Sequence, residues 1–112
     1  MTEAWQYAYR VGREERWGGK NLEGLTVWIT GLSGSGKSTL AEEVLRKTIE
    51  VGRCAQVLDA DNLRSTLNQD LGYDDADREE NVRRIGEVAI LVADTGAVVI
   101  VPVISPSTIA RA

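Results

Sequence analysis

The sequence predicts an α/β fold that is built on a parallel sheet. Strand-like and helix-like segments alternate along the chain, and a glycine-rich turn joins the first strong strand to a helix. A third observation is an almost unbroken apolar run over residues 97–104, which is typical of a parallel strand covered on both faces. With 112 residues, the chain has room for one domain with a modest core.

Two strands and the helix between them form the first half of the predicted domain. We expect strands over residues 25–30 and 54–58, where apolar residues are concentrated. The helix is expected to begin at Lys37, because leucine, alanine, valine and isoleucine recur from there at helical spacing. Gly52 is expected to end this helix.

Two further helices lead to the apolar third strand. A short helix is expected to begin at Asn62, after the acids that close the second strand. A longer helix follows, with Asp74 or Asp75 as its N-cap and with apolar residues at helical spacing. Gly96 is expected to end it, directly before the third strand.

Residues 1–23 are expected to form an N-terminal arm, ahead of a domain over residues 24–112. Aromatic and apolar residues of this arm alternate with smaller or polar ones, which predicts a short strand. We favour an arm that covers a sheet edge or a neighbouring subunit. An aromatic platform for a ligand is the alternative, but no polar residues converge on it. The alternating residues are Trp5, Tyr7, Tyr9 and Val11.

Composition and charge narrow the classes of function. The net charge of −4 and the pI near 4.8 argue against a protein that binds nucleic acid through a broadly basic surface. The chain has no histidine and one cysteine, Cys54, so an internal disulfide and a Cys/His zinc site are excluded. Any proton acceptor must then be a carboxylate, a lysine or a tyrosine. No signal peptide and no membrane-spanning run is found, so we expect a soluble cytoplasmic protein without a membrane partner.

The segment from Gly31 to Ser38 fits the pattern G-x-x-x-x-G-K-[ST] of a phosphate-binding P-loop. Its glycines allow successive backbone N–H groups to point at one phosphate, and the following helix adds its positive N-terminal end. Lys37, a candidate catalytic residue, would neutralise the outer phosphates of ATP, and the Ser38 hydroxyl would bind Mg²⁺. The alternative is a chance match in a glycine-rich turn, which the flanking strand and helix disfavour. The residues expected to contact the nucleotide are Gly31, Ser33, Gly34, Ser35, Gly36, Lys37, Ser38 and Thr39.

Two acids, Asp59 and Asp61, close the second strand, whereas the third strand ends at Ile104 and Ser105 without one. Because ligands of an open parallel sheet lie at the C-terminal ends of its strands, both carboxylates are expected near the phosphates. One, for which we take Asp59, would hold the water shell of Mg²⁺, and Asp61 would accept the proton of an attacking hydroxyl. Alternatively, one of them, more readily Asp61, only caps the helix expected at Asn62. Acids at this position favour a small-molecule kinase over a motor-type ATPase.

A second set of residues could bind an anion that is attached to a flat base. Arginine forks suit phosphate or sulfate oxygens, and an aromatic ring can stack on a nucleobase. The alternative is that the arginines are surface residues paired with nearby acids and that the tyrosine fills the core. From chemistry alone, both interpretations stay open. The residues concerned are Arg64, Tyr73, Arg78 and Asn81.

Five blocks of the sequence, in their order and spacing, resemble the adenylyl-sulfate kinase family. They are residues 31–39 (GLSGSGKST), 58–64 (LDADNLR), 70–73 (DLGY), 77–84 (DREENVRR) and 104–106 (ISP). The resemblance runs from about residue 25 to residue 105. It implies a P-loop nucleoside triphosphate hydrolase-like three-layer fold, with ATP and Mg²⁺ as cofactors. The implied activity is transfer of the γ-phosphoryl group of ATP to the 3'-hydroxyl of adenosine 5'-phosphosulfate, a step of sulfate assimilation.

The resemblance also implies roles for individual residues. Asp61 would lie near the 3'-hydroxyl of the acceptor, and an arginine after the ISP turn is matched by Arg111. The sequence departs from the family pattern where Ala60 replaces a glycine, where Tyr73 replaces a phenylalanine and at residues 107–108. We expect the Ala60 methyl to disfavour a positive φ and to crowd the acceptor. The residues implied to hold adenosine 5'-phosphosulfate are Asp61, Arg64, Tyr73, Arg78, Asn81, Ile104 and Ser105.

Family domains continue past the last matched block with more sheet and a basic lid, so we expect a truncated fold. Without later strands, residues 25–30 would form a bare sheet edge. We therefore expect the isolated chain to be weakly stable, to form a homodimer or larger oligomer, or to associate with a missing C-terminal part. Two other functions stay open: an inactive nucleotide-binding fragment or regulatory module without the lid, and another small-molecule P-loop kinase.

Overall fold

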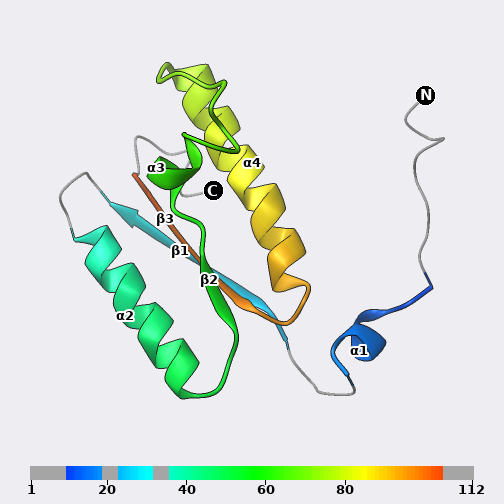
Figure 1. Ribbon diagram of the computed structural model, residues 1–112. Helices are drawn as coiled ribbons and strands as arrows, with labels where there is room; N and C mark the ends of the chain where they lie inside the picture. The colour runs from blue at the N-terminus through cyan, green and yellow to red at the C-terminus, as the bar shows by residue number, and fades with distance from the viewer. Residues whose placement is uncertain (1–9, 19–22, 32–35, 105–112) are drawn as a thin grey trace.

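A computed structural model describes residues 10–18, 23–31 and 36–104 (Figure 1). The predicted order of strand, helix, strand, helices and strand is confirmed. One short helix in the N-terminal arm was not predicted. The elements are α1 (Arg13–Arg16), β1 (Leu25–Gly31), α2 (Lys37–Glu50), β2 (Ala55–Val57), α3 (Ala60–Leu63), α4 (Asp75–Ala93) and β3 (Val98–Ile104).

The three strands form one parallel sheet in the order β1-β3-β2. The register pairs Leu25 with Val98 at one end of β1 and Gly31 with Ile104 at the other. β3 is the central strand of the sheet. Its residues Val99, Ile100 and Val101 are fully buried, as expected of a parallel strand that is covered on both faces. The predicted parallel α/β architecture is therefore confirmed.

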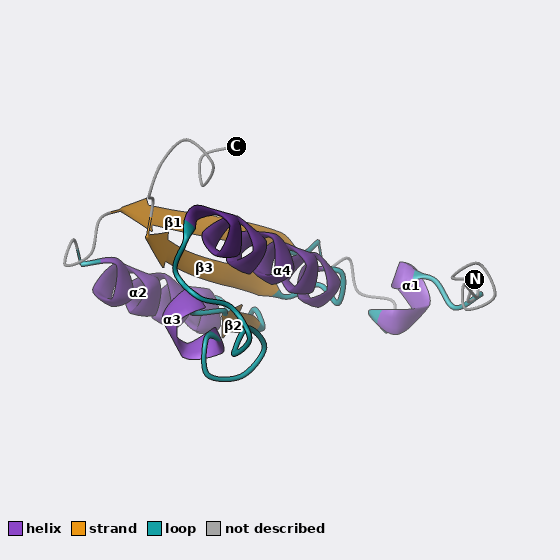
Figure 2. Ribbon diagram, turned by 90° about the horizontal axis from the view of Figure 1, so that it is seen from above, coloured by secondary structure: helices purple, strands orange, loops and turns teal. Residues whose placement is uncertain are grey.

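Successive residues of β3 pack against different helices, as the alternation of a strand requires. Val99 and Val101 lie in one core cluster with Ile85 of α4, whereas Ile100 lies in a second cluster with Ala41 of α2. The sheet is thus the middle of three layers, with α2 on one face and α4 on the other (Figures 1 and 2). This arrangement fixes the N-terminal ends of both helices relative to the C-terminal ends of the strands.

Within the described part of the chain, β1 pairs with β3 and has no strand on its other side. Leu25 and Trp28 of this strand are 57% and 40% exposed. The expectation that residues 25–30 form a sheet edge is therefore confirmed for the described residues. An unpaired edge of this kind offers backbone N–H and C=O groups to a further strand.

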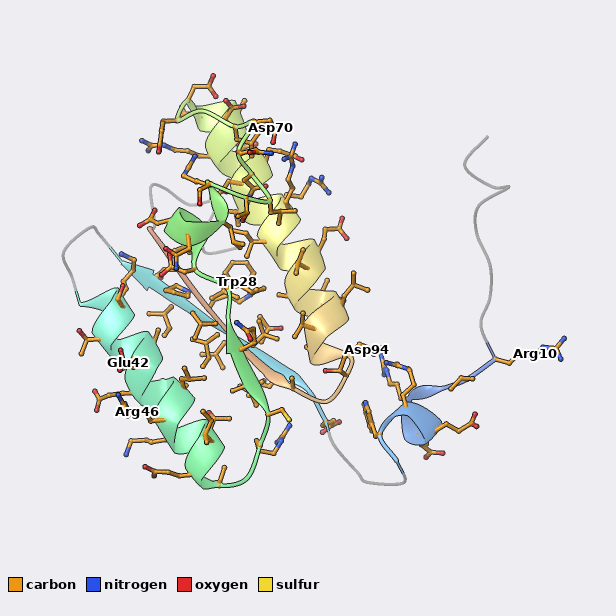
Figure 3. The ribbon with its side chains drawn as sticks, viewed as in Figure 1. Arg10, Trp28, Glu42, Arg46, Asp70 and Asp94 are labelled. Carbon is orange, nitrogen blue, oxygen red and sulfur yellow. The ribbon has the colours of Figure 1, made fainter. Side chains whose placement is uncertain are left out.

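The N-terminal arm differs from its prediction. Residues 11 and 12 are not part of a strand, and a single helical turn follows at α1; Trp5, Tyr7 and Tyr9 lie outside the described residues. The arm contacts the C-terminal end of α4, where the Asp94 carboxylate pairs with Arg13 and Arg16 (Figure 3). The Trp17 indole N–H donates to the Asp94 carbonyl at 3.1 Å. The guanidinium of Arg16, and then that of Arg13, lowers the pKa of the Asp94 carboxyl.

The start of α3 also differs from its prediction. The helix begins at Ala60 instead of Asn62, and its N-cap is Asp59, one of the two acids that the sequence offers for this role. One carboxylate oxygen of Asp59 accepts from the backbone N–H of Asp61 at 2.9 Å and of Asn62 at 3.3 Å. A carboxylate that accepts from the first N–H groups of a helix is a strong cap. For α4, Asp74 is the N-cap, one of the two residues that the sequence predicts.

None of the helices described is long and apolar enough to cross a membrane.

Candidate functional site

A pocket of about 120 Å³ lies between α3, the loop that follows it and the first half of α4, with Val103 of β3 at its base. We name it the α3–α4 pocket. It brings together side chains from three segments that are separate in the sequence. Its lining residues are Ala60, Asp61, Arg64, Tyr73, Arg78, Asn81, Val82 and Val103, and they include most of the predicted acceptor residues.

Arg64 and Tyr73 form one corner of this pocket. The guanidinium carbon of Arg64 lies 4.2 Å from the centre of the Tyr73 ring. In this cation–π arrangement, the ring face attracts the positive charge of Arg64. Arg64 also donates from Nη1 to the Gly72 carbonyl at 2.8 Å, which fixes the plane of the guanidinium. Tyr73 is 67% exposed. The alternative in which this tyrosine fills the core is therefore wrong.

The ion pairs between described residues of this region do not include the pocket residues Arg64 and Arg78. Glu80 pairs with Arg83 and Arg84, which lie beyond the pocket wall. Within residues 36–104, neither Arg64 nor Arg78 has an ion-pair partner. The alternative of two surface arginines neutralised by nearby acids is thus not supported. Among its described lining residues, the pocket presents two cations and a single carboxylate, that of Asp61.

Asn81 is almost fully buried in the wall of the pocket, with 4% of its surface exposed. Its side-chain oxygen accepts from Nδ2 of Asn68, which is completely buried in the loop between α3 and α4. Arg84 donates to the oxygen of Asn68 at 3.3 Å. Asn68 was not predicted from the sequence, because it belongs to no motif and lies in a turn among exposed residues.

Arg84 connects this loop to α4. Its Nη1 and Nη2 donate to the two carboxylate oxygens of Asp70 at 2.8 and 3.1 Å, and its Nε donates to Glu80 at 2.8 Å. Figure 3 shows Asp70 beside the N-terminal end of α4. The hydrogen bond from Arg84 lowers the pKa of the Asp70 carboxyl. Hydrogen bonds from Arg83 and then Arg84 lower the pKa of Glu80 to about 2, from an ordinary value of 4.5.

These lowered pKa values predict an acid-sensitive fold. Since the pKa of Glu80 is lower in the folded than in the unfolded chain, its contribution to stability is present above about pH 4.5 and is lost as the pH falls towards about 2. The urea midpoint of Glu80→Gln should therefore lie below that of the wild type at neutral pH and should approach it near pH 2. Glu79→Gln, on the exposed side of α4, should match the wild type throughout. A Glu80→Gln deficit that stays constant with pH would contradict this interpretation.

The predicted phosphate cradle begins and ends in described residues. Gly31 ends β1 and Gly36 directly precedes α2, with a φ of +88° that favours glycine. Lys37 is the first residue of α2, and Ser38 and Thr39 follow in its first turn. The motif thus has the order that phosphate binding at a helix N-terminus requires, with β1 before it and α2 after it. Ser33, Gly34 and Ser35 lie outside the described residues.

Ser38 and Asp59 line a common groove of about 480 Å³ between α2 and β2. Glu42 and Arg46 lie on the helix side of this groove, where they form an ion pair of 2.7 Å (Figure 3). Of the Asp59 carboxylate, Oδ1 is used by the cap of α3. A hydroxyl and one carboxylate oxygen suit Mg²⁺, which binds few protein ligands and takes others from water and phosphate. Asp59 and Asp61 thus face different cavities.

Ala60 does not carry the expected backbone strain. It is the first residue of α3, and no described non-glycine residue has a positive φ. The expectation that its methyl group opposes the local conformation is therefore wrong. The methyl group does line the α3–α4 pocket. Ile104 ends β3 opposite Gly31, and Ser105 and Arg111 lie outside the described residues.

Residues 23–112 match the family model described as Adenylylsulphate kinase. The chain belongs to the adenylyl-sulfate kinase family. Among adenylyl-sulfate kinases, Adenylyl-sulfate kinase 3 of Arabidopsis thaliana is 53% identical to it over 96 residues, which cover 86% of this chain and 46% of the relative. Adenylyl-sulfate kinase of Emericella nidulans is 51% identical over 96 residues, which cover 86% of this chain and 47% of the relative. The chain thus spans about half the length of these relatives.

Solved structures of adenylyl-sulfate kinases share the fold. The structure of the APS kinase CysC of Mycobacterium tuberculosis in complex with AMPPNP and APS has a TM-score of 0.74 and 57% identity, over 80% of this chain and 54% of that one. A hexameric APS kinase from Thiobacillus denitrificans has a TM-score of 0.72 and 39% identity, over 88% of this chain and 20% of that one. The predicted P-loop kinase fold and the resemblance on which it rested are confirmed.

Proposed function

We propose that this chain carries the nucleotide and acceptor sites of an adenylyl-sulfate kinase, which transfers the γ-phosphoryl group of ATP to the 3'-hydroxyl of adenosine 5'-phosphosulfate. The observation that carries the proposal is the α3–α4 pocket, where Arg64 and Arg78 lack acidic partners among the described residues and Asp61 is the sole carboxylate. A relative of 57% identity has been solved with AMPPNP and APS. The product would be 3'-phosphoadenylyl sulfate.

The pocket suits an anion joined to an aromatic base. Two guanidinium groups offer several N–H donors in a fixed plane to phosphate and sulfate oxygens. One face of the Tyr73 ring is covered by Arg64, and the exposed ring can stack on adenine with its other face. Asn81 adds an amide for hydrogen bonding. In this proposal Ile104 and Ser105 complete the pocket from the end of β3.

In the proposed reaction, the 3'-oxygen attacks the γ-phosphorus of ATP and the bond between that phosphorus and the β–γ bridging oxygen breaks. The hydroxyl proton passes to the carboxylate of Asp61, and ADP leaves with the bridging oxygen. Lys37 and the backbone N–H groups of residues 31–39 neutralise the phosphates. Ser38 and Asp59 would hold Mg²⁺, which supplies charge neutralisation between the phosphate oxygens.

Formation of 3'-phosphoadenylyl sulfate from ATP-Mg²⁺ and adenosine 5'-phosphosulfate tests this proposal. The assay is run on the 112-residue chain and on the same chain extended by the C-terminal segment of a family relative. We expect the extended chain to form the product. If neither chain forms product, although both bind Mg-ATP, the second candidate below is correct.

A second candidate is a nucleotide-binding fragment or regulatory module without turnover. Such a module would bind Mg-ATP at the groove that Ser38 and Asp59 line and would form no product. Another small-molecule kinase is less favoured, because the pocket is lined by a buried asparagine and by two arginines that form no ion pair with any described residue. Turnover with adenosine 5'-phosphosulfate, compared with other hydroxyl acceptors, separates the three.

Arg78→Gln should weaken binding of adenosine 5'-phosphosulfate by about ten- to hundredfold, since a charge-assisted hydrogen bond to an anion contributes roughly 1.5–3 kcal/mol. Arg83→Gln is the matched control, because it removes the same charge from an exposed position on the same helix. Calorimetric titration measures both affinities. Equal losses in the two variants would mean that only overall charge matters.

The edge of β1, which has no strand beside it among the described residues, leads to a proposal on assembly. We propose that the chain associates through this edge, either with a second copy or with a segment that supplies the next strand. Sedimentation of the 112-residue chain should therefore reveal association that increases with concentration. A monomer that melts cooperatively at ordinary temperature would contradict this proposal.

A further inference from the structure

The buried amides beside the α3–α4 pocket form a hydrogen-bond chain with a fixed direction. Arg84 can only donate, so the oxygen of Asn68 must face it. Nδ2 of Asn68 then faces Asn81 and donates to its oxygen. The oxygen of Asn81 is therefore used, and its Nδ2 remains for a group in the pocket that Asn81 lines.

We propose that Asn68 and Arg84 are positioning residues that make Asn81 a hydrogen-bond donor towards the ligand of the α3–α4 pocket. The ligand must then place an acceptor at Asn81, such as a ring nitrogen of adenine or an oxygen of the phosphosulfate group. This inference rests on the proposed function for the identity of the ligand. It assigns a role to Asn68, which does not line the pocket.

Arg84 can set this direction because it is itself held in place. Two hydrogen bonds to Asp70 and one to Glu80 fix its guanidinium between the loop and α4. Asn68 and Asn81 are 0% and 4% exposed, so water does not compete for the hydrogen bond between their amides. An isolated pair of amides could exchange donor and acceptor by rotating together. The fixed cation at one end removes this freedom.

Asn68→Asp tests the proposal with almost no change of shape. One oxygen of the new carboxylate still accepts from Arg84, but the other oxygen now faces the oxygen of Asn81. Because two acceptors repel each other, the Asn81 amide should rotate and turn its oxygen into the pocket. We expect affinity for adenosine 5'-phosphosulfate to fall about ten- to hundredfold, with affinity for Mg-ATP within about twofold of wild type.

The loss of affinity in Asn68→Asp must act through Asn81. A double-mutant cycle measures this coupling. In an Asn81→Ala background, Asn68→Asp should change affinity for adenosine 5'-phosphosulfate by less than about twofold. A purely structural role for Asn68, or repulsion of the anion by the new charge, would give the same loss in both backgrounds. Gln69→Glu is the charge control, since it adds the same charge at the exposed neighbouring position.

If Asn68→Asp does not fold, as judged by circular dichroism, Arg84→Met tests the same chain from its other end. Without the donor, Asn68 and Asn81 can rotate together, and affinity should fall about two- to fivefold, again only when Asn81 is present. Wild-type affinity in the variant that folds, or equal losses with and without Asn81, would overturn the inference. Failure of the wild-type chain to bind adenosine 5'-phosphosulfate would instead overturn the proposed function.

Discussion

Asp61→Asn should lower phosphoryl transfer to adenosine 5'-phosphosulfate by about 10²–10⁴-fold, the usual contribution of a general base, and leave Mg-ATP binding nearly unchanged. Asp61 lies in the first turn of α3 and lines the α3–α4 pocket. The cap of α3 is made by Asp59, so loss of the Asp61 charge should not unfold the helix. Product formation in the extended chain and calorimetry with Mg-ATP measure the two effects.

Asp75→Asn is the matched control for this variant. Asp75 is an exposed acid in the first turn of α4, and the lining of the pocket does not include it. Its replacement also removes one negative charge from the first turn of a helix and should leave transfer within about twofold of wild type. Wild-type turnover by Asp61→Asn would show that the assignment of the base is wrong.

Gly24→Ala should destabilise the fold by about 3 kcal/mol. A Cβ atom at this position would lie 1.7 Å from the carbonyl oxygen of Ala93 and 2.6 Å from its carbonyl carbon. Both atoms belong to the backbone at the end of α4, so no side-chain rotation relieves the clash. The start of β1 would have to move away from α4. Urea denaturation followed by circular dichroism measures the loss.

Gly86→Ala provides the comparison. Gly86 lies inside α4, and a Cβ atom there would make ordinary contacts of 3.8 and 3.9 Å with the ring of Trp28. Because alanine is the better helix former, this variant should gain roughly 0.5–1 kcal/mol. If both substitutions have the same effect, close approach of β1 to α4 does not determine stability at Gly24.

Periodicity and turn chemistry were sufficient to predict most of the fold. The run over residues 97–104 became the buried central strand β3, and the glycine-rich turn lies between β1 and α2. The start of α3 was misplaced, because the segment Asp59-Ala60-Asp61-Asn62 offers several good caps in a row. The structure uses Asp59, whose carboxylate accepts from the N–H groups of Asp61 and Asn62.

The candidate site was predicted unevenly. The P-loop could be read from its own motif, whereas the pocket residues depended on the family resemblance, because isolated arginines have many alternative partners. The buried pair of Asn68 and Asn81 could not be predicted, since it joins residues of separate elements and neither periodicity nor propensity specifies such contacts. The ion pairs of Arg13 and Arg16 with Asp94 also join separate elements and could not be predicted for the same reason.

The central claim is that the α3–α4 pocket binds the acceptor nucleotide, and chemical-shift mapping tests it most directly. Adenosine 5'-phosphosulfate is titrated into the ¹⁵N-labelled chain. The account predicts that the largest shifts fall on Arg64, Tyr73, Arg78 and Asn81, with small shifts on Glu42 and Arg46 in the groove beside α2. Shifts concentrated in that groove, or none at saturating ligand, would contradict it.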